Sequence, residues 1–364
     1  MGSRRSAHEE ILGLDRRRAL VTVGVALVLA LGTFTLIGRA AEFDELSEAV
    51  RKANKAWFPL GLAGLLLAYA GYVMAYRDVA RSNGGPRFRL WTVARVVAIG
   101  FGANLVGSAA AGLAVDFWAL RRAGVALHEA ARRVLGLNTL EWAVLGLFAT
   151  GAACVVLARR GEAPRAMTLS WIVLVPACAA AAAWVSSPRR AARLTEVEGV
   201  ERPGPGAGVR AWLRWLWGKV RKGLADAIGG VLVVRHVLAR PHRYVAGVAG
   251  FPVYWFGHLL TLYAGLRAFT GEHVPLAALV LAFATGYVAT ALPLPGGGSG
   301  GIEAAMTFSL HAVGLELAPA LLGVVLYRVF TFWLPVIPAL LLLPTVRSLN
   351  DELPATPREA AAPV

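Results

Sequence analysis

Long apolar runs separated by short polar segments make up most of the chain. They cover residues 19–38, 57–76, 96–114, 139–157, 167–185, 245–269, 276–292, 302–315 and 317–346. Most are close to the roughly 20 residues that a helix needs to cross a bilayer. The last run exceeds one span and contains Pro335, Pro338 and Pro344, so we expect a kink or a break there. The pattern predicts an all-α polytopic membrane protein.

Two segments alternate apolar and charged positions at helical spacing. Residues 39–58 carry acids and bases around Phe43, Leu46 and Val50, which is typical of an interfacial amphipathic helix or of a plain helical linker. Residues 209–240 combine arginines and lysines with Trp212, Trp215 and Trp217. We expect this second segment to lie along an anionic membrane surface, held by charge and by aromatic anchoring.

Composition supports a membrane protein and excludes several other classes. Of the 364 residues, 57% are hydrophobic and 16% are charged, against about 25% charged in a soluble domain. The net charge of +15 lies in loops, where positive-inside topology explains it, so we expect no nucleic-acid partner. The two cysteines fall inside apolar runs and the seven histidines show no ligand spacing, so we expect no metal and no cofactor.

A glycine- and proline-rich stretch interrupts the apolar pattern near the C-terminal end. Residues 292–303 read Leu-Pro-Leu-Pro-Gly-Gly-Gly-Ser-Gly-Gly-Ile-Glu. Lipid cannot satisfy the backbone groups that such a break frees, so the break must be buried in protein or line a cavity. We predict the tip of a re-entrant hairpin, where glycine N–H groups suit an anionic head group. The alternative is an extramembrane turn between two ordinary spans.

The distribution of basic residues predicts a second hairpin. If every early run spans the membrane and the N-terminus is inside, the basic loop 187–243 falls outside, against the positive-inside tendency. If residues 96–114 instead dip in from the cytoplasm and return, 28 of the 37 Lys and Arg lie inside, eight lie outside and Arg328 lies in the membrane. Asn104 and Ser108 could satisfy a broken backbone in this glycine-rich run. The alternative is one glycine-rich spanning helix packed through small residues.

The resulting organisation has about six full spans and two opposed re-entrant hairpins, the pattern of an inverted repeat. We predict a cytoplasmic basic N-terminus (1–18), a first membrane half (19–186), a cytoplasmic basic linker with an interfacial helix (187–243), a second membrane half (244–346) and a disordered tail (347–364). Both termini are expected in the cytoplasm.

Few ionisable residues fall inside the apolar runs, and such residues are functional by default. Glu303 follows the glycines and Arg328 lies deep in the last run. Arg328 could bind a lipid phosphate or pair with Glu303, and such a pair could serve transport or merely lock the hairpin. Asp116 follows the first hairpin and could belong to a gate or to a solvated face. We interpret Glu141 as a charge at a helix N-terminus.

A family resemblance rests on the C-terminal motifs. Pro293-Leu-Pro-Gly-Gly, Gly300-Gly-Ile-Glu303, Leu326-Tyr-Arg328 and Trp333-Leu-Pro335 resemble the lysylphosphatidylglycerol synthase transmembrane-region superfamily, which includes the flippase half of the bacterial multiple peptide resistance factor. The resemblance implies lipid translocation in a bacterial plasma membrane, with Gly297, Gly301, Glu303 and Arg328 as core site residues. Two departures put the cargo in doubt. Only eighteen residues follow Val346, so we expect no aminoacyltransferase domain, and the first half reads Asn104-Leu-Val-Gly-Ser where many relatives have proline and arginine.

The function favoured by these observations is a flippase for an anionic or aminoacylated phospholipid or a polyprenyl-linked lipid. Asn104 and Asp116 would add to the substrate-binding residues from the first half. The glycine-rich stretch lacks the Lys-Ser/Thr of a P-loop, so we expect neither ATP use nor an enzyme. The alternatives are a non-transporting scaffold for a lipid-modifying enzyme and a membrane-embedded enzyme acting on lipid phosphates.

Overall fold

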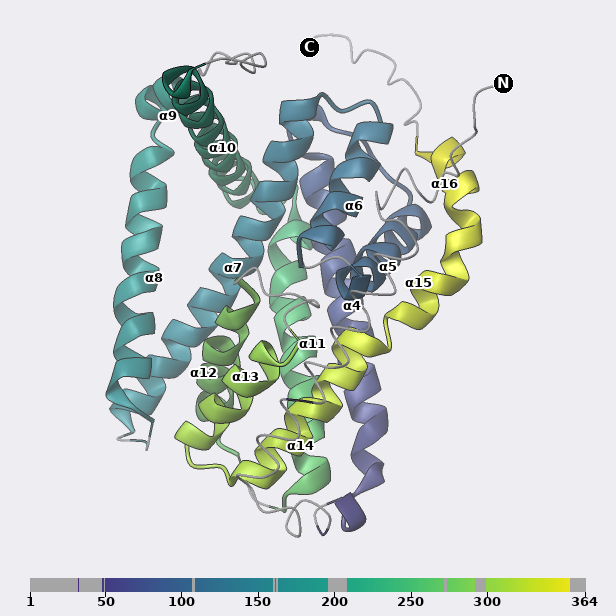
Figure 1. Cartoon of the computed structure of the whole chain (residues 1–364), viewed down its shortest axis with the longest axis vertical. Coiled ribbons are helices and arrows are strands. Elements are labelled where there is room, and N and C mark those ends of the chain that lie inside the picture. The colour runs from purple at the N-terminus through teal and green to yellow at the C-terminus, as the bar shows by residue number, and fades with distance from the viewer. Residues whose placement is uncertain are drawn as a thin grey trace.

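The computed structural model describes residues 50–106, 109–159, 163–195, 208–271, 274–291 and 299–353, with residues 32, 48 and 161 as isolated positions. Every regular element in this part of the chain is a helix (Figure 1). The first apolar run, the first half of the amphipathic segment 39–58, the hairpin tip with Gly297 and most of the tail lie outside the described residues. The prediction of an all-α polytopic membrane protein is confirmed.

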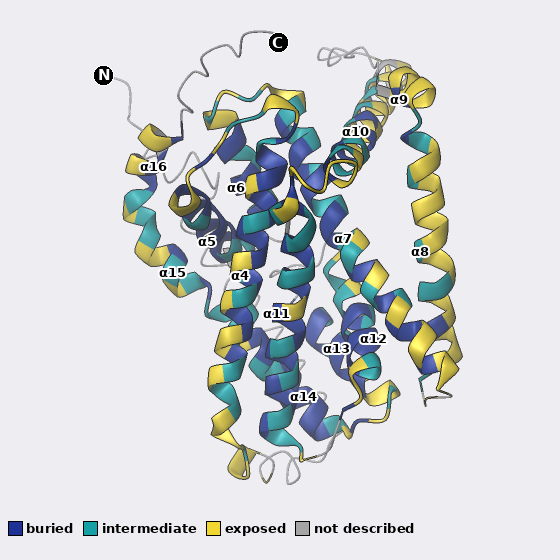
Figure 2. Ribbon diagram, turned by 180° about the vertical axis from the view of Figure 1, so that it is seen from behind, coloured by how far each residue is buried: buried dark blue, intermediate teal, exposed yellow. Residues whose placement is uncertain are grey.

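Five helical segments are long and apolar enough to cross a bilayer within the described residues. Four are single helices: α4 (Phe58–Ala80, preceded by η1, Lys55–Trp57), α7 (Leu127–Ala158), α8 (Arg165–Val185) and α11 (Val245–Phe269). The fifth is composite and covers Leu317–Thr345. Helix α11 packs along the length of α4 at the centre of the bundle, whereas α8 lies at the edge with most of its surface exposed (Figure 2).

The fifth segment is broken where the prolines predicted. Helix α14 (Leu317–Arg328) continues into a π-helical turn, η5 (Val329–Trp333), and the chain resumes beyond Pro335 as α15 (Val336–Leu342), η6 (Leu343–Thr345) and α16 (Val346–Glu352). A π-helical turn inside an α-helix frequently marks a functional position. This π-helical turn directly follows Arg328, the one arginine predicted to lie inside the membrane.

Two pairs of shorter helices enter the bundle without crossing it. The first pair is α5 (Leu90–Val106) and α6 (Ala109–Arg122), and the second is α12 (Leu276–Tyr287, followed by η3, Val288–Ala291) and α13 (Gly301–Ala312). Helices α12 and α13 have 12 residues each, which is about 18 Å at 1.5 Å per residue and well short of a 30 Å hydrocarbon core. Each pair therefore turns back inside the bundle (Figure 1).

The two pairs open at opposite ends of the bundle. At one end, Arg133 near the start of α7 donates a hydrogen bond to the backbone oxygen of Ser82, just beyond α4, so the chain enters α5 and leaves α6 on the same side. At the other end, the Asn54 N–H before α4 donates to the Ala268 oxygen at the end of α11, where the chain proceeds to α12. This is the opposed arrangement that the sequence predicts.

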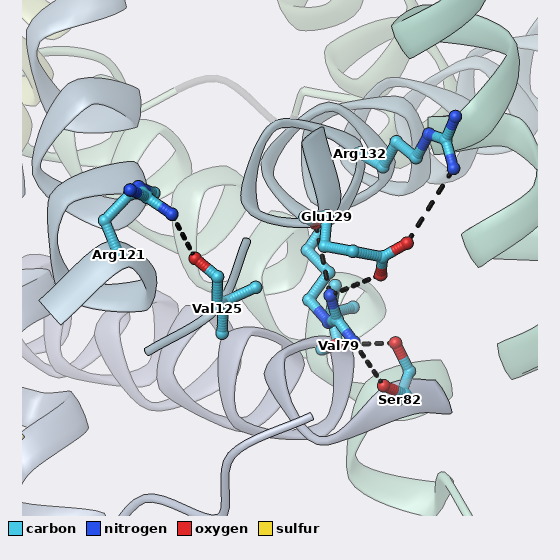
Figure 3. A network of polar contacts seen from close by, with 7 residues as sticks. Val79, Ser82, Arg121, Val125, Glu129 and Arg132 are labelled. Carbon is cyan, nitrogen blue, oxygen red and sulfur yellow. Dashed lines mark hydrogen bonds and ion pairs between the residues drawn. The ribbon is translucent and has the colours of Figure 1, made fainter. Parts of the chain in front are cut away.

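The first end of the bundle is strongly basic, and we call it the basic end. It carries η2 (Ser82–Gly84), α9 (Pro188–Thr195) and the long α10 (Val209–Leu238). Figure 3 shows polar contacts at this end, among them Arg121, which donates to the Val125 oxygen. Arg133 of α7 donates to Glu129 in the same helix and to the Ser82 oxygen, and the second bond joins α7 to the segment after α4. Along α10, large apolar side chains stay exposed, as a membrane-surface helix requires: Trp212, Leu213, Leu216, Trp217, Val220 and Leu224.

Close backbone packing holds the second pair together, and it can be tested. A Cβ added at Gly286 in α12 would lie 2.4 Å from the Cα of Met306 in α13, a distance that real Cβ atoms do not reach. We therefore expect Gly286→Val to force the two helices apart and to lower the melting temperature in detergent. Gly223→Val in α10, where nothing lies within 4 Å, serves as the control and should have little effect.

Candidate functional site: a buried polar centre linking the two hairpins

Glu303 and Arg328 form a buried ion pair at the start of α13, next to the tip of the second hairpin. Gly300 precedes α13 with φ 86°, a backbone conformation that favours glycine, and its N–H donates to Glu303 Oε2 at 2.7 Å. The other carboxylate oxygen, Oε1, accepts from Arg328 Nε at 2.9 Å. Glu303 is 5% exposed and Arg328 is 8% exposed. The pairing that the sequence suggested is therefore formed, away from solvent, between α13 and α14.

The pair leaves part of the arginine unused. Arg328 Nη2 is buried and has no hydrogen-bond partner within the described residues, while its guanidinium lies over the Phe332 ring, 4.0 Å from the centroid. Two hydroxyls on the same hairpin, Ser299 Oγ and Thr307 Oγ1, are likewise buried without a described partner. Buried donors are normally satisfied, so an arginine with a free fork position is suited to an incoming oxygen ligand.

Asp116 is a similarly buried acid in the first hairpin. It is 2% exposed, and Tyr72 of α4 donates to its carboxylate at 2.8 Å while Tyr76 donates to its backbone oxygen at 3.0 Å. The interpretation of Asp116 as part of a solvated face is wrong, because α6 turns this residue toward α4. Asn104 acts as the sequence proposed: its Oδ1 accepts from the Gly112 N–H at 2.8 Å and joins the two arms of the hairpin.

Glu141 is a buried residue that the sequence interpretation misplaced. Helix α7 begins at Leu127, so Glu141 lies well inside it and is not an N-terminal charge. Its carboxyl lies beside Tyr254 and Asn138, and its backbone oxygen accepts from Trp255 Nε1 at 2.9 Å. Neither Glu141 nor Asp116 forms an ion pair with any described residue, which is unusual for acids at this depth.

Aromatic rings connect these polar groups across the bundle. Tyr72 lies 5.7 Å from Tyr254, Tyr254 lies 4.5 Å from His258, and His258 lies 5.8 Å from Tyr327, measured between ring centroids. His258 Nδ1 is 2.8 Å from the Tyr327 hydroxyl, next in sequence to Arg328. Tyr254 and His258 are therefore part of the buried centre.

The structure brings some of the expected site residues into contact and leaves others apart. Glu303 and Arg328 are in direct contact, and Gly301 begins the helix that positions Glu303. Asp116 and Asn104 belong to the other hairpin, where Asp116 contacts the series of rings through Tyr72 and Asn104 contacts Gly112. Gly297 lies outside the described residues. Together these features describe a multi-pass membrane protein whose two hairpins meet a buried polar centre.

The comparison with known families agrees with this architecture. The family described as the lysylphosphatidylglycerol synthase transmembrane region matches residues 21–339, which is most of the chain. The chain belongs to this family. A search of curated proteins finds no match.

Proposed function

We propose that this protein is a flippase that passes the head group of an anionic or aminoacylated lipid, or of a polyprenyl-linked lipid, between the two hairpins. The observation that carries the proposal is Arg328, which is buried, is held by Glu303 through Nε and has no hydrogen-bond partner for Nη2 among the described residues. Holding one edge of a guanidinium with a carboxylate orients its other edge, and a guanidinium fork matches a phosphate oxygen pair. In this proposal the protein acts in a bacterial plasma membrane and catalyses no covalent step.

Alternating access supplies the mechanism in this proposal. Broken helices near the middle of the membrane commonly form transport sites, because their free backbone groups can replace the hydration of a polar head group. The hairpins open at opposite ends, so each can expose the centre to one side. Arg328 would hold the phosphate, and Asp116 and Glu141 would offer acceptor oxygens to an amino or hydroxyl group on the head group.

The test is lipid translocation in proteoliposomes, with fluorescent anionic lipids and polyprenyl phosphates as cargo. We expect Glu303→Gln and Arg328→Ala to lower the translocation rate at least about tenfold, the effect of losing one charge-assisted contact of about 1.4 kcal/mol. The matched control is the Arg95–Glu352 ion pair, which has the same 2.9 Å separation but lies at the basic end. Glu352→Gln should leave the rate unchanged. A wild-type protein that moves none of these lipids would contradict the proposal and favour a scaffold.

The orientation in the membrane is a second part of the proposal. We place the basic end in the cytoplasm, because cytoplasmic loops are enriched in lysine and arginine. In a background with Cys154 and Cys178 replaced by serine, we expect a cysteine at Gly271, at the opposite end, to react with an impermeant maleimide in intact cells. A cysteine at Ala126, at the basic end, should react only after permeabilisation. The reverse labelling pattern would invert the assignment.

A further inference from the structure

Two adjoining hollows lie at the basic end, away from the buried centre. The larger, about 450 Å³, is lined by Arg77, Asp78, Arg81, Arg87, His242, Arg243, Val245 and Ala246. The smaller, about 300 Å³, is lined by Arg81, Asn83, Gly84, Arg87, His236, Arg240, Arg243 and Tyr244. They share Arg81, Arg87 and Arg243, so we treat them as one feature, the arginine cleft. It lies where the end of α4 and η2 meet the end of α10 and the start of α11.

The cleft contains far more positive charge than the protein itself neutralises. Five arginines line it, namely Arg77, Arg81, Arg87, Arg240 and Arg243, against a single acid, Asp78. That acid is already used: it accepts from Arg81 Nε at 2.7 Å and from the Gly247 N–H at 2.7 Å. The side chains of Arg77, Arg87 and Arg243 are exposed and form no ion pair with described residues.

The histidines that line the cleft do not offset the positive charge of its arginines. His236 is in contact with Arg240 Nη1 at 2.7 Å and with the Tyr244 hydroxyl at 3.2 Å. Desolvation, together with the charges of Arg240 and Arg243, lowers the pKa of His236, so the ring stays neutral at pH 7. With His236 neutral, the lining residues sum to about four positive charges, since five arginines face one aspartate.

We propose that the arginine cleft binds a phosphate group, or a pair of linked phosphates, with at least two negative charges. A phosphodiester with one charge would leave most of the field uncompensated, whereas a phosphomonoester or a diphosphate matches it. Arg87 and Arg243 line both hollows and can therefore contact two oxygens, or two phosphorus centres, of one ligand. The first residues of α11, Val245 and Ala246, add the positive end of a helix to the same hollow. This site is separate from Arg328, so the inference does not depend on the flippase proposal.

Two sources could supply such a group, and the shared chemistry is the multiply charged phosphate. A lipid head group would approach along the membrane surface, where we expect the N-terminal half of α10 to lie, because its tryptophan and leucine side chains are exposed. A free diphosphate would come from solution. The experiment therefore uses one probe of each kind and a singly charged lipid for comparison.

The test measures binding to the purified full-length protein. The probes are dioctanoyl phosphatidic acid, inorganic pyrophosphate and dioctanoyl phosphatidylglycerol. We expect at least one of the first two to bind about tenfold or more tightly than the phosphodiester lipid, equivalent to about 1.4 kcal/mol. Competition between the first two would indicate one site that takes both, and binding of only one would identify the source.

Variants locate the binding. Arg87→Ala combined with Arg243→Ala removes two exposed side chains and should weaken the preferred probe about tenfold or more without unfolding the protein. Arg189→Ala combined with Arg193→Ala removes equal charge from α9 at the same end but outside the cleft, and should change little. Equal losses in the two double variants, or no preference among the probes, would overturn the proposal. Glu303→Gln should bind the probe like wild type. A failure of the phosphate-binding inference can therefore be told apart from a failure of the flippase proposal.

Discussion

Replacing Glu303 and Arg328 together, by glutamine and methionine, is expected to restore much of the stability lost in either single variant without restoring lipid translocation. Removing one partner of a buried ion pair costs about 3–5 kcal/mol, because the remaining charge is buried and unpaired. Removing both partners with side chains of similar volume is often close to neutral. The single variants Glu303→Gln and Arg328→Met should therefore melt well below wild type, and the double variant should melt near it.

The double variant separates the two interpretations of this pair that the sequence left open. If the pair only locks the hairpin, a stable double variant should translocate lipid normally. If Arg328 also binds the head group, the stable double variant should remain inactive, since its free Nη2 donor is gone. Thermal melting in detergent and translocation in proteoliposomes give the two measurements. A fully active double variant would remove Arg328 from the substrate path.

The sequence predicts the two re-entrant hairpins by different signals. One signal is a local motif, and the other is the number of basic residues on each side of the membrane, summed over the chain. The prolines and glycines between Leu292 and Gly301 break any helix, whatever surrounds them. The first hairpin has no such break and was inferred from the sum of basic residues across the chain. In the structure, its arms approach at Gly100 and Gly112, where a Cβ on Gly100 would lie 3.5 Å from the opposing backbone oxygen. Small residues in both arms were visible in the sequence, but their partners were not.

The environments of Asp116 and Glu141 depend on contacts that a local sequence pattern does not show. Asp116 follows an apolar run and precedes two arginines, so it resembled a solvated residue. Its burial is explained by Tyr72, 44 residues away. Glu141 was misplaced because the apolar run starts at residue 139, whereas α7 continues back through Arg132 and Arg133. A helix can carry Arg133 in a buried position here because Glu129 and the Ser82 oxygen accept hydrogen bonds from its Nη1 and Nη2.

The arginine cleft is a surface feature that also could not be predicted from a local sequence pattern, because its residues come from distant parts of the chain. Arg77 lies in the last turn of α4, Arg81 and Arg87 follow that helix, and Arg240 and Arg243 come from the segment after α10. Each group alone is typical of a cytoplasmic loop and satisfies the positive-inside tendency. Only the packing of α4 against α11 brings them to one place, where Gly71 and Gly250 allow the helix backbones to approach closely.

Glu141→Gln is expected to leave the protein as stable as wild type, or more stable by about 1 kcal/mol, while changing its response to a pH gradient. The glutamine keeps hydrogen-bonding groups for Tyr254 and Asn138, and it removes a carboxyl that has no described cation beside it. Under the flippase proposal, a buried carboxyl of this kind is the best candidate to exchange a proton during transport. Translocation by the variant should then be the same with and without a pH gradient, whereas wild type should respond to the gradient.

The control for this prediction lies on the same helix. Glu129 in α7 is paired with Arg133 at 2.8 Å near the basic end. Glu129→Gln should lose stability, because it leaves the nearly buried Arg133 with one partner fewer, but it should keep the wild-type response to a gradient. The opposite outcome at Glu141, a large loss of stability like that of Glu303→Gln, would mean that Glu141 is paired with a cation in the folded protein. In that case Glu141 would hold the bundle together as Glu303 does, and proton exchange would have to be assigned to Asp116.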